Sequence, residues 1–385
     1  MQKQAFWNDP RYRAWFFQVL AILLVGGFFA TIAVNTIDNL RAMNVASGFG
    51  FLRHTAGFGI SQTLIEYSEA STYGRAFFVA LLNTLLVAGI GIVFATVLGF
   101  LVGIARLSSN WLVAKLATVY IETFRNIPLL LQILFWYTAV LSNLPAPRDS
   151  MQFGGMLLNK RGLYAPAPAG DPGFEYVMLA FAVALLGIII LRRLSERKRM
   201  NTGVGLPVLF PGLGLVFGVP LLVFWLAGSP LHFEVPELRG FNFVGGLRAP
   251  PELLALVFAL SIYTASFIAE IVRSGIQAVN WGQSEAALAL GLRRPEVLRL
   301  VVVPQALRVI IPPLTSQFLN LTKNSSLAAA LAYPELASVF AGTVLNQTGQ
   351  AVEVLAITMA VYLSLSLLTS MAMNFYNSRI ALVER

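Results

Sequence analysis

Long stretches without a charged side chain limit what this chain can fold into. Seven of them cover residues 14–34, 76–105, 126–147, 176–191, 200–233, 253–269 and 354–378. An eighth covers residues 309–334 and is interrupted only by Lys323. Because a membrane-spanning helix needs about 20 consecutive apolar residues, the pattern predicts an all-α, polytopic membrane protein with about eight transmembrane helices.

The composition supports this interpretation and excludes several functions. Hydrophobic residues make up 57% of the 385 residues and charged residues only 12%, against about a quarter charged in soluble domains. Eight spans leave no room for a second globular domain. Since the chain has no cysteine and two histidines, we predict no metal site and no cofactor bound by this chain.

The net charge of +9 would suggest nucleic-acid binding in a soluble protein. Here membrane topology explains the charge, because basic loops stay in the cytoplasm and face anionic headgroups. The run RRLSERKR at residues 192–199 makes the middle loop cytoplasmic, and an even number of spans then places both termini there. The lipid bilayer is therefore an expected partner, and nucleic acid is not.

Two segments on the predicted outer side are rich in glycine, proline and aromatic residues. They cover residues 149–175 and 229–252. Either they cover the outer mouth of the helices, or they form a docking platform for an extracytoplasmic partner. The sequence leaves both interpretations open.

One charged stretch lies between apolar runs and cannot span a membrane. Residues 284–307 read SEAALALGLRRPEVLRLVVVPQAL. Strong helix formers follow Glu285, and Gly291 comes where a helix C-terminus favours a left-handed residue. Pro295 fits the first turn of a second helix, and Pro304 is predicted to break that helix where the next span begins. The pattern predicts two short helices joined by a glycine turn.

The charged stretch has two interpretations. Three arginines between residues 293 and 299 would suit an amphipathic helix lying on lipid headgroups. However, three alanines between residues 286 and 289 give the first short helix a small, smooth face with little apolar bulk to insert into lipid. Such a face with one acid is better suited to a groove in another protein.

This stretch resembles the EAA loop of binding-protein-dependent ABC importer permeases. The resemblance rests on the run 285–287, on the glycine four residues after it, and on the apolar-proline pair at 303–304. In that family the loop is a coupling helix that seats in a cleft of the cytoplasmic ATPase. The resemblance implies a coupling loop at residues 280–305 with the coupling residues Glu285, Ala286, Ala287, Gly291 and Pro304.

Three further stretches resemble the polar amino-acid permeases, which serve histidine, glutamate, glutamine and arginine. They are ETFRNIPLLLQ at residues 122–132, SIYTASFIAEIVRSGI at 261–276 and NLTKNSSL at 320–327. The five-helix ABC type I importer core of that class maps onto stretches that begin near residues 76, 118, 253, 305 and 350. The additional segments resemble the long permeases of general L-amino-acid and glutamate/glutamine/aspartate/asparagine importers.

The resemblance divides the chain into four parts. Residues 1–75 hold a cytoplasmic tail, the first transmembrane helix and a periplasmic segment, and residues 76–142 hold the first two core helices. Residues 143–252 are an insertion with two extra transmembrane helices and periplasmic loops. Residues 253–385 hold the last three core helices and the coupling loop.

The same resemblance implies a permease subunit in the bacterial inner membrane. It would take up L-amino acids by ATP-driven alternating access and receive them from a periplasmic binding protein. A similar second permease and two copies of an ABC ATPase would complete the complex. No lysine of this chain follows a glycine, so the sequence has no phosphate-binding loop, and ATP and Mg²⁺ are expected on the partner ATPase.

Ionisable side chains in or near the spans are candidates for a structural or functional role, because charge is costly at membrane depth. Glu270 and Arg273 are three residues apart, as are Glu122 and Arg125. Residues at this spacing lie on one helix face. We therefore predict two structural ion pairs.

A polar patch surrounds Lys323. The lysine could attract the α-carboxylate of an amino acid, while the neighbouring amides and hydroxyls form hydrogen bonds with the polar groups of that amino acid. The alternatives are that Lys323 reaches out to the headgroups, and that polar side chains in spans hold helices together. The candidate residues of the translocation path are Asn83, Gln317, Asn320, Lys323, Asn324 and Ser325.

Two other functions fit the sequence less well. An ion-coupled secondary amino-acid transporter would show inverted repeats with broken helices, and no such repeat is recognisable. It would also leave the pattern at residues 285–304 without a role. A structural or assembly protein would leave the patch around Lys323 unexplained.

Overall fold

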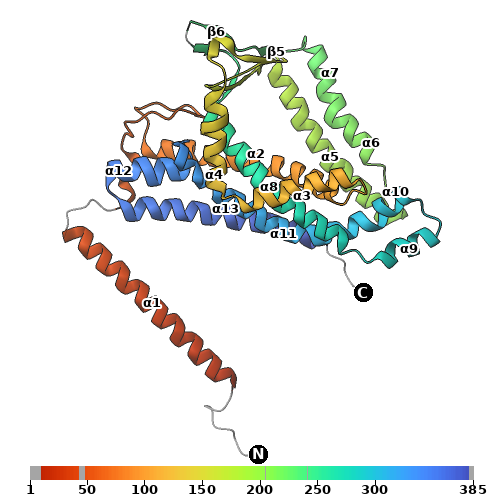
Figure 1. Ribbon diagram of the computed structural model, residues 1–385, viewed down its shortest axis with the longest axis horizontal. Helices are drawn as coiled ribbons and strands as arrows, with labels where there is room; N and C mark the ends of the chain where they lie inside the picture. The colour runs from red at the N-terminus through yellow and green to blue at the C-terminus, as the bar shows by residue number, and fades with distance from the viewer. Residues whose placement is uncertain (1–9, 43–47, 204, 241, 381–385) are drawn as a thin grey trace, which may run out of the picture. The chain divides into compact units, whose positions relative to one another are not determined.

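The computed structural model describes residues 10–42, 48–203, 205–240 and 242–380. They are mostly helical, as predicted for a polytopic membrane protein (Figure 1). The chain divides into two compact units, of which the first comprises Met1–Ile133 and Leu256–Arg385 and the second comprises Leu134–Ala255.

The α-helices are numbered along the chain. They are α1 (Pro10–Ala42), α2 (Tyr73–Arg106), α3 (Trp111–Asn126), α4 (Leu129–Leu134), α5 (Phe174–Thr202), α6 (Leu209–Leu213), α7 (Val219–Leu226), α8 (Pro251–Gln277), α9 (Trp281–Ala289), α10 (Arg294–Val297), α11 (Val303–Asn324), α12 (Leu345–Thr348) and α13 (Ala351–Ile380). Turns of 3₁₀ or π-helix are η2 (Phe49–Arg53), η3 (Phe135–Val140), η4 (Leu141–Asn143), η5 (Pro147–Asp149), η6 (Gly214–Gly218), η7 (Leu298–Val302), η8 (Ser325–Leu331) and η9 (Ala337–Val344).

Six helices of the described residues are long and apolar enough to span a membrane, and a bent pair would make a seventh. The six cover Tyr12–Thr36, Tyr73–Arg106, Phe174–Thr202, Pro251–Gln277, Arg294–Leu331 and Ala351–Ser378. The eight apolar stretches of the sequence thus correspond to six or seven long helices and one shorter apolar helix, Phe210–Leu226.

The apolar helix in the stretch at residues 200–233 is shorter than the stretch itself. Its first residues end α5, its last residues form a strand, and only Phe210–Leu226 between them is an apolar helix. At 1.5 Å per residue this helix is roughly 25 Å long, somewhat less than the ~30 Å thickness of a bilayer core. The helix is shorter than the charge-free stretch because a lack of charge does not by itself distinguish helix from strand.

The stretch at residues 126–147 also differs from a simple span. Helices α3 and α4, with the turns after α4, form a pair that is bent by 105°. Pro128 lies in the break, and a proline keeps the residue before it out of the helical conformation. The Gln132 side chain donates hydrogen bonds of 3.0 Å to two backbone oxygens near the break, which satisfies carbonyl groups that the bend leaves free.

In the part of the chain that the structure describes, short strands, which an all-α prediction does not include, lie in the second unit alone. They are β1 (Met151–Phe153), β2 (Met156–Asn159), β3 (Gly162–Ala165), β4 (Ala167–Gly170), β5 (Leu231–Glu234), β6 (Glu237–Arg239), β7 (Asn242–Val244) and β8 (Leu247–Ala249). Their sheets have the orders β1-β2-β3-β8, β4-β5 and β6-β7.

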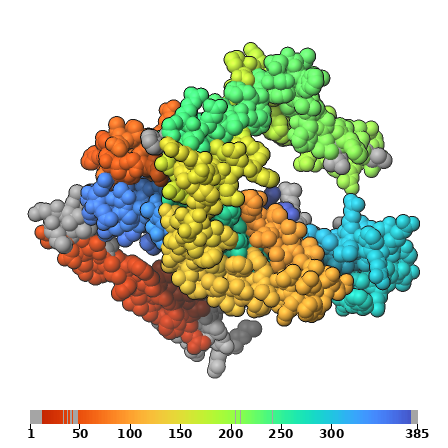
Figure 2. Space-filling view, turned by 45° about the horizontal axis from the view of Figure 1, so that its top comes forward, coloured from red at the N-terminus to blue at the C-terminus, as the bar shows by residue number. Residues whose placement is uncertain are grey.

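Strand pairing joins the two segments that flank α5 and α7. In β3 and β8, Leu163 lies opposite Ala249, and in β4 and β5, Ala169 lies opposite His232. Figure 2 shows the two segments side by side, the first in yellow and the second in green. Since paired strands lie on one side of a membrane, the helices between them must leave that side and return to it. The two predicted roles of these strands, covering the outer mouth of the helices and docking an extracytoplasmic partner, stay predictions.

In the first unit, α2 packs closely against α8 through small residues. Ala95, Gly99 and Gly103 are spaced four residues apart on one face of α2. A Cβ added at Gly99 would lie 2.6 Å from the Cβ of Ile268, and one added at Gly103 would lie 2.7 Å from the backbone oxygen of Ala269. Such faces are typical of helix pairs in membranes, where close backbone approach stabilises packing.

Candidate functional site

The charged stretch folds as the short helix α9 and a glycine turn, both as predicted, and the turn leads into a second helical segment. Helix α9 begins after Asn280, whose side-chain oxygen accepts a hydrogen bond from the backbone N–H of Gly282 at 2.9 Å. Gly291 follows the helix with φ at 84°, and its N–H donates to the backbone oxygen of Leu288 at 2.9 Å. A left-handed residue after a helix is favourable for glycine and unfavourable for most other residues.

Helix α9 is a surface helix outside the six long apolar helices. Ala287 is buried, whereas Glu285 and Ala286 are exposed. Trp281 is 75% exposed and Leu290 is 84% exposed. The Glu285 carboxylate accepts a hydrogen bond from the indole N–H of Trp281 at 2.8 Å, which keeps both side chains on one face. The helix thus presents an acid and large apolar side chains to its surroundings.

The second short helix matches the prediction at its start and differs at its end. Pro295 lies in the first turn of α10, and the Glu296 carboxylate accepts a hydrogen bond from the backbone N–H of Arg293 at 2.7 Å. Pro304 does not break the helix, because α10, η7, α11 and η8 form one long helical segment. The π-helical turn η7 ends two residues before the proline, and its wider winding accommodates a residue that has no N–H.

Four of the six predicted path residues lie near the C-terminal end of α11. Asn320 and Lys323 are exposed, and Gln317 and Asn324 are partly buried. Among the described residues, no carboxylate forms an ion pair with Lys323. The two exposed residues continue a stripe of exposed positions along α11 that comprises Val309, Pro312, Pro313 and Ser316.

The other two predicted path residues, Asn83 and Ser325, are buried. The Asn83 side-chain amide donates hydrogen bonds of 2.9 Å to the backbone oxygens of Gln62 and Pro334. The Ser325 hydroxyl donates to the backbone oxygen of Thr322 at 2.7 Å. Asn83 therefore holds segments of the first unit together, which is the alternative role stated for polar groups in spans, whereas the Ser325 bond stays within its own helical segment.

A buried carboxylate, Glu335, lies in the turn between η8 and η9. It is 0% exposed and accepts hydrogen bonds from the backbone N–H groups of Ala337 and Ser338 at 2.9 and 2.6 Å and from the Tyr362 hydroxyl at 2.7 Å. Burial raises the pKa of the Glu335 carboxyl above its usual range, against the opposing effect of these donors. Sequence reasoning misses this residue, because a glutamate after an apolar run looks like the start of an exposed loop.

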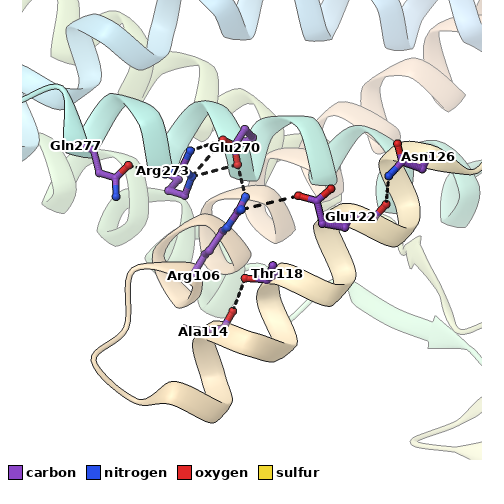
Figure 3. A network of polar contacts seen from close by, with 8 residues as sticks. All are labelled: Arg106, Ala114, Thr118, Glu122, Asn126, Glu270, Arg273 and Gln277. Carbon is purple, nitrogen blue, oxygen red and sulfur yellow. Dashed lines mark hydrogen bonds and ion pairs between the residues drawn. The ribbon is translucent and has the colours of Figure 1, made fainter.

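The predicted ion pair between Glu270 and Arg273 forms (Figure 3). The Nη2 atom of Arg273 lies 2.5 Å from Oε1 of Glu270, and its Nη1 atom donates to Oε1 of Gln277 at 2.5 Å. Arg106, the last residue of α2, contacts the same Glu270 carboxylate from the neighbouring helix. Sequence spacing cannot indicate this contact, because the two residues are 164 positions apart.

The predicted pair between Glu122 and Arg125 does not form. The guanidinium carbon of Arg125 lies 5.1 Å from the centroid of the Phe267 ring, and Oε1 of Glu122 lies 3.9 Å from Nη2 of Arg106. Both side chains thus turn to partners on other helices. The spacing of three residues permits a pair, but tertiary contacts decide between competing partners.

Comparison with known proteins supplies the family of this membrane protein. The family model described as "Binding-protein-dependent transport system inner membrane component" matches residues 200–382. The putative amino-acid ABC transporter permease protein YhdX of Escherichia coli is 56% identical over 98% of this chain and 96% of its own length. The chain belongs to this family of binding-protein-dependent transport components.

Two further relatives match this transport component over its whole length. The general L-amino acid transport system permease protein AapQ of Rhizobium johnstonii is 56% identical over 98% of this chain and 94% of its own length. The glutamate/glutamine/aspartate/asparagine transport system permease protein BztB of Rhodobacter capsulatus is 42% identical over 98% and 96%. Nothing in these matches supports the ion-coupled alternative.

Proposed function

We propose that this chain is the permease subunit of an ABC importer that takes up L-amino acids across the bacterial inner membrane, with both termini in the cytoplasm. The substrate class is supported by the relatives that match along the whole chain, since each is named as an amino-acid permease. A periplasmic binding protein delivers the amino acid in this proposal.

Helix α9 carries the proposal. It exposes Trp281, and Leu290 is exposed directly after its end, outside the long apolar helices and on the loop that resembles the ATPase-coupling loop. Exposed apolar groups of this size mark contact surfaces. In this proposal, α9 binds in a cleft of a separate ABC ATPase. The ATPase is present in two copies and binds ATP and Mg²⁺.

The proposed mechanism follows from the connections of α9. Residues 278–280 join it to α8, and residues 290–293 join it to the helical segment of α10 and α11. ATP binding draws the two ATPase subunits together and moves α9, and its two neighbours move with it. The pore then opens outward, the binding protein releases its amino acid, and ATP hydrolysis returns the pore to the inward-open state.

A second permease, similar to this one, completes the pore in this proposal. The support is the exposed stripe of α11, which includes Ser316, Asn320 and Lys323 inside a membrane-spanning segment. Lipid satisfies neither the hydrogen bonds nor the charge of such groups. The stripe therefore fits a water-filled path between two permeases.

Replacing Lys323 with alanine should lower amino-acid uptake roughly tenfold or more, the loss expected when a charge-assisted hydrogen bond to a carboxylate is removed. The measurement is uptake at several substrate concentrations by the complex in liposomes. Lys323→Arg, which keeps the charge, is the matched control and should retain most uptake. Unchanged apparent affinity and rate in the alanine variant would remove Lys323 from the path.

The experiment that tests the function is gentle purification of the chain from its own cells. An ATP-hydrolysing subunit should accompany it, and the binding protein loaded with an amino acid should stimulate the hydrolysis. A chain that purifies without an ATPase and still transports amino acids down an ion gradient would contradict the proposal.

A further inference from the structure

Arg106, the last residue of α2, lies between α3 and the C-terminal part of α8. Its Nη1 atom contacts Oε2 of Glu270 on α8, and its Nη2 atom lies 3.9 Å from Oε1 of Glu122 on α3 (Figure 3). The side chains of Arg106 and Glu270 are only 20% and 26% exposed. One guanidinium group at the end of α2 thus reaches a carboxylate on each of two other helices.

The part of α8 that Arg106 contacts is the base from which α9 starts. Gly103 of α2 is packed against the backbone of Ala269, which directly precedes Glu270. Further along α8, Gly275 leaves no room for a Cβ beside Ile310 of α11. Only residues 278–280 separate the end of α8 from α9. Movement of α9 therefore reaches the neighbourhood of Glu270 through a short and closely packed connection.

Helix α3 has its own contacts with α8, and these do not involve α2. The Tyr120 hydroxyl donates a hydrogen bond to the backbone oxygen of Ile262 at 2.7 Å, and Arg125 lies over the ring of Phe267. The Glu270–Arg273 pair is internal to α8. Removing Arg106 would leave all three interactions in place and would break the charged link among α2, α3 and α8.

We infer that Arg106 is a positioning residue for ATP-driven transport, which makes the ends of α2 and α3 follow the end of α8 when α9 moves. The inference rests on the proposed function. An arginine suits this role because its planar fork of donors can hold two carboxylates at once, whereas the ammonium group of a lysine acts at one point. The partly buried contact between Arg106 and Glu270 is screened less than a surface pair is, whereas the contact with Glu122, whose side chain is 57% exposed, is the weaker of the two.

The test compares Arg106→Ala with the wild type in the complete complex, reconstituted in liposomes with its ATPase and binding protein. The quantity measured is the number of amino-acid molecules imported per ATP hydrolysed. We expect an assembled complex that hydrolyses ATP but imports roughly tenfold less per ATP, in the range of coupling between distant sites. Lys115→Ala is the matched control, because Lys115 is an exposed cation on α3, and it should leave the ratio unchanged.

Two further variants separate positioning from folding. Arg106→Lys keeps the charge and should restore the ratio only in part. The exchange R106E/E270R keeps two arginines and two glutamates among positions 106, 122, 270 and 273. It should recover part of the import per ATP that either single change loses. If assembled complexes of Arg106→Ala or Arg106→Lys import as much per ATP as the wild type, the inference is wrong. A wild-type complex without stimulated ATP hydrolysis would instead contradict the proposed function itself.

Discussion

Replacing Gly103 with leucine should prevent the first unit from packing, and folded protein should fail to accumulate. A Cβ at this position would lie 2.7 Å from the backbone oxygen of Ala269 and 2.8 Å from the Cβ of Val272. Because a backbone oxygen cannot turn aside as the end of a side chain can, α2 and α8 must separate. We expect a destabilisation of about 3 kcal/mol or more, measured as the thermal unfolding temperature and yield of the chain in detergent.

Gly89→Leu is the matched control for this change. Gly89 lies on the same helix, and a Cβ added there would meet no atom within 4 Å. The control should purify with the yield and unfolding temperature of the wild type, because leucine also favours helix more than glycine does. A Gly103→Leu variant that behaves like this control would contradict the close packing of α2 and α8.

Replacing Gly291 with valine should uncouple ATP hydrolysis from transport, with the amino acid imported per ATP falling roughly tenfold. The φ of Gly291 is 84°, and a Cβ added there would meet no atom within 4 Å. The change therefore acts through the backbone alone. A β-branched residue disfavours the left-handed conformation, so the turn shifts and α9 changes its direction relative to α10. The measurement is import and ATP hydrolysis by the reconstituted complex.

Gly291→Asn is the control, because asparagine adopts the left-handed conformation at little cost. It should transport nearly as the wild type does. If an intact complex with Gly291→Val imports as much amino acid per ATP as the wild type, the direction of α9 does not matter for coupling. The role assigned to the turn would then be wrong.

Local patterns were sufficient to predict the membrane class and the turn at Gly291. The length of an apolar run indicates directly whether a segment can span lipid. A glycine after a run of helix formers likewise indicates a left-handed residue at the helix end. The number of spans was less predictable from charge alone. The break at Pro128 and the strand within residues 200–233 both lie in charge-free sequence, and backbone geometry decides them.

Features that depend on tertiary contacts could not be predicted. Glu122 and Arg125 have the spacing of an ion pair, yet each turns to a partner on another helix. Pro304 looks like a helix break, but the π-helical turn before it lets the helix continue. Asn83 looked like a path residue because its chemistry is polar, and only the fold shows that its amide is used to hold two backbone segments.

The contact between α9 and an ATPase is the central claim of the proposed function, and site-directed cross-linking tests it directly. The chain has no cysteine, so Ala286→Cys places a single reactive thiol on the exposed face of α9. A photoactivated cross-linker on this thiol should form an adduct with the ATPase subunit in the assembled complex. Phe153→Cys on β1, where the native side chain is 83% exposed, should form none. An intact, ATP-hydrolysing complex in which Ala286→Cys yields no ATPase adduct would contradict the account.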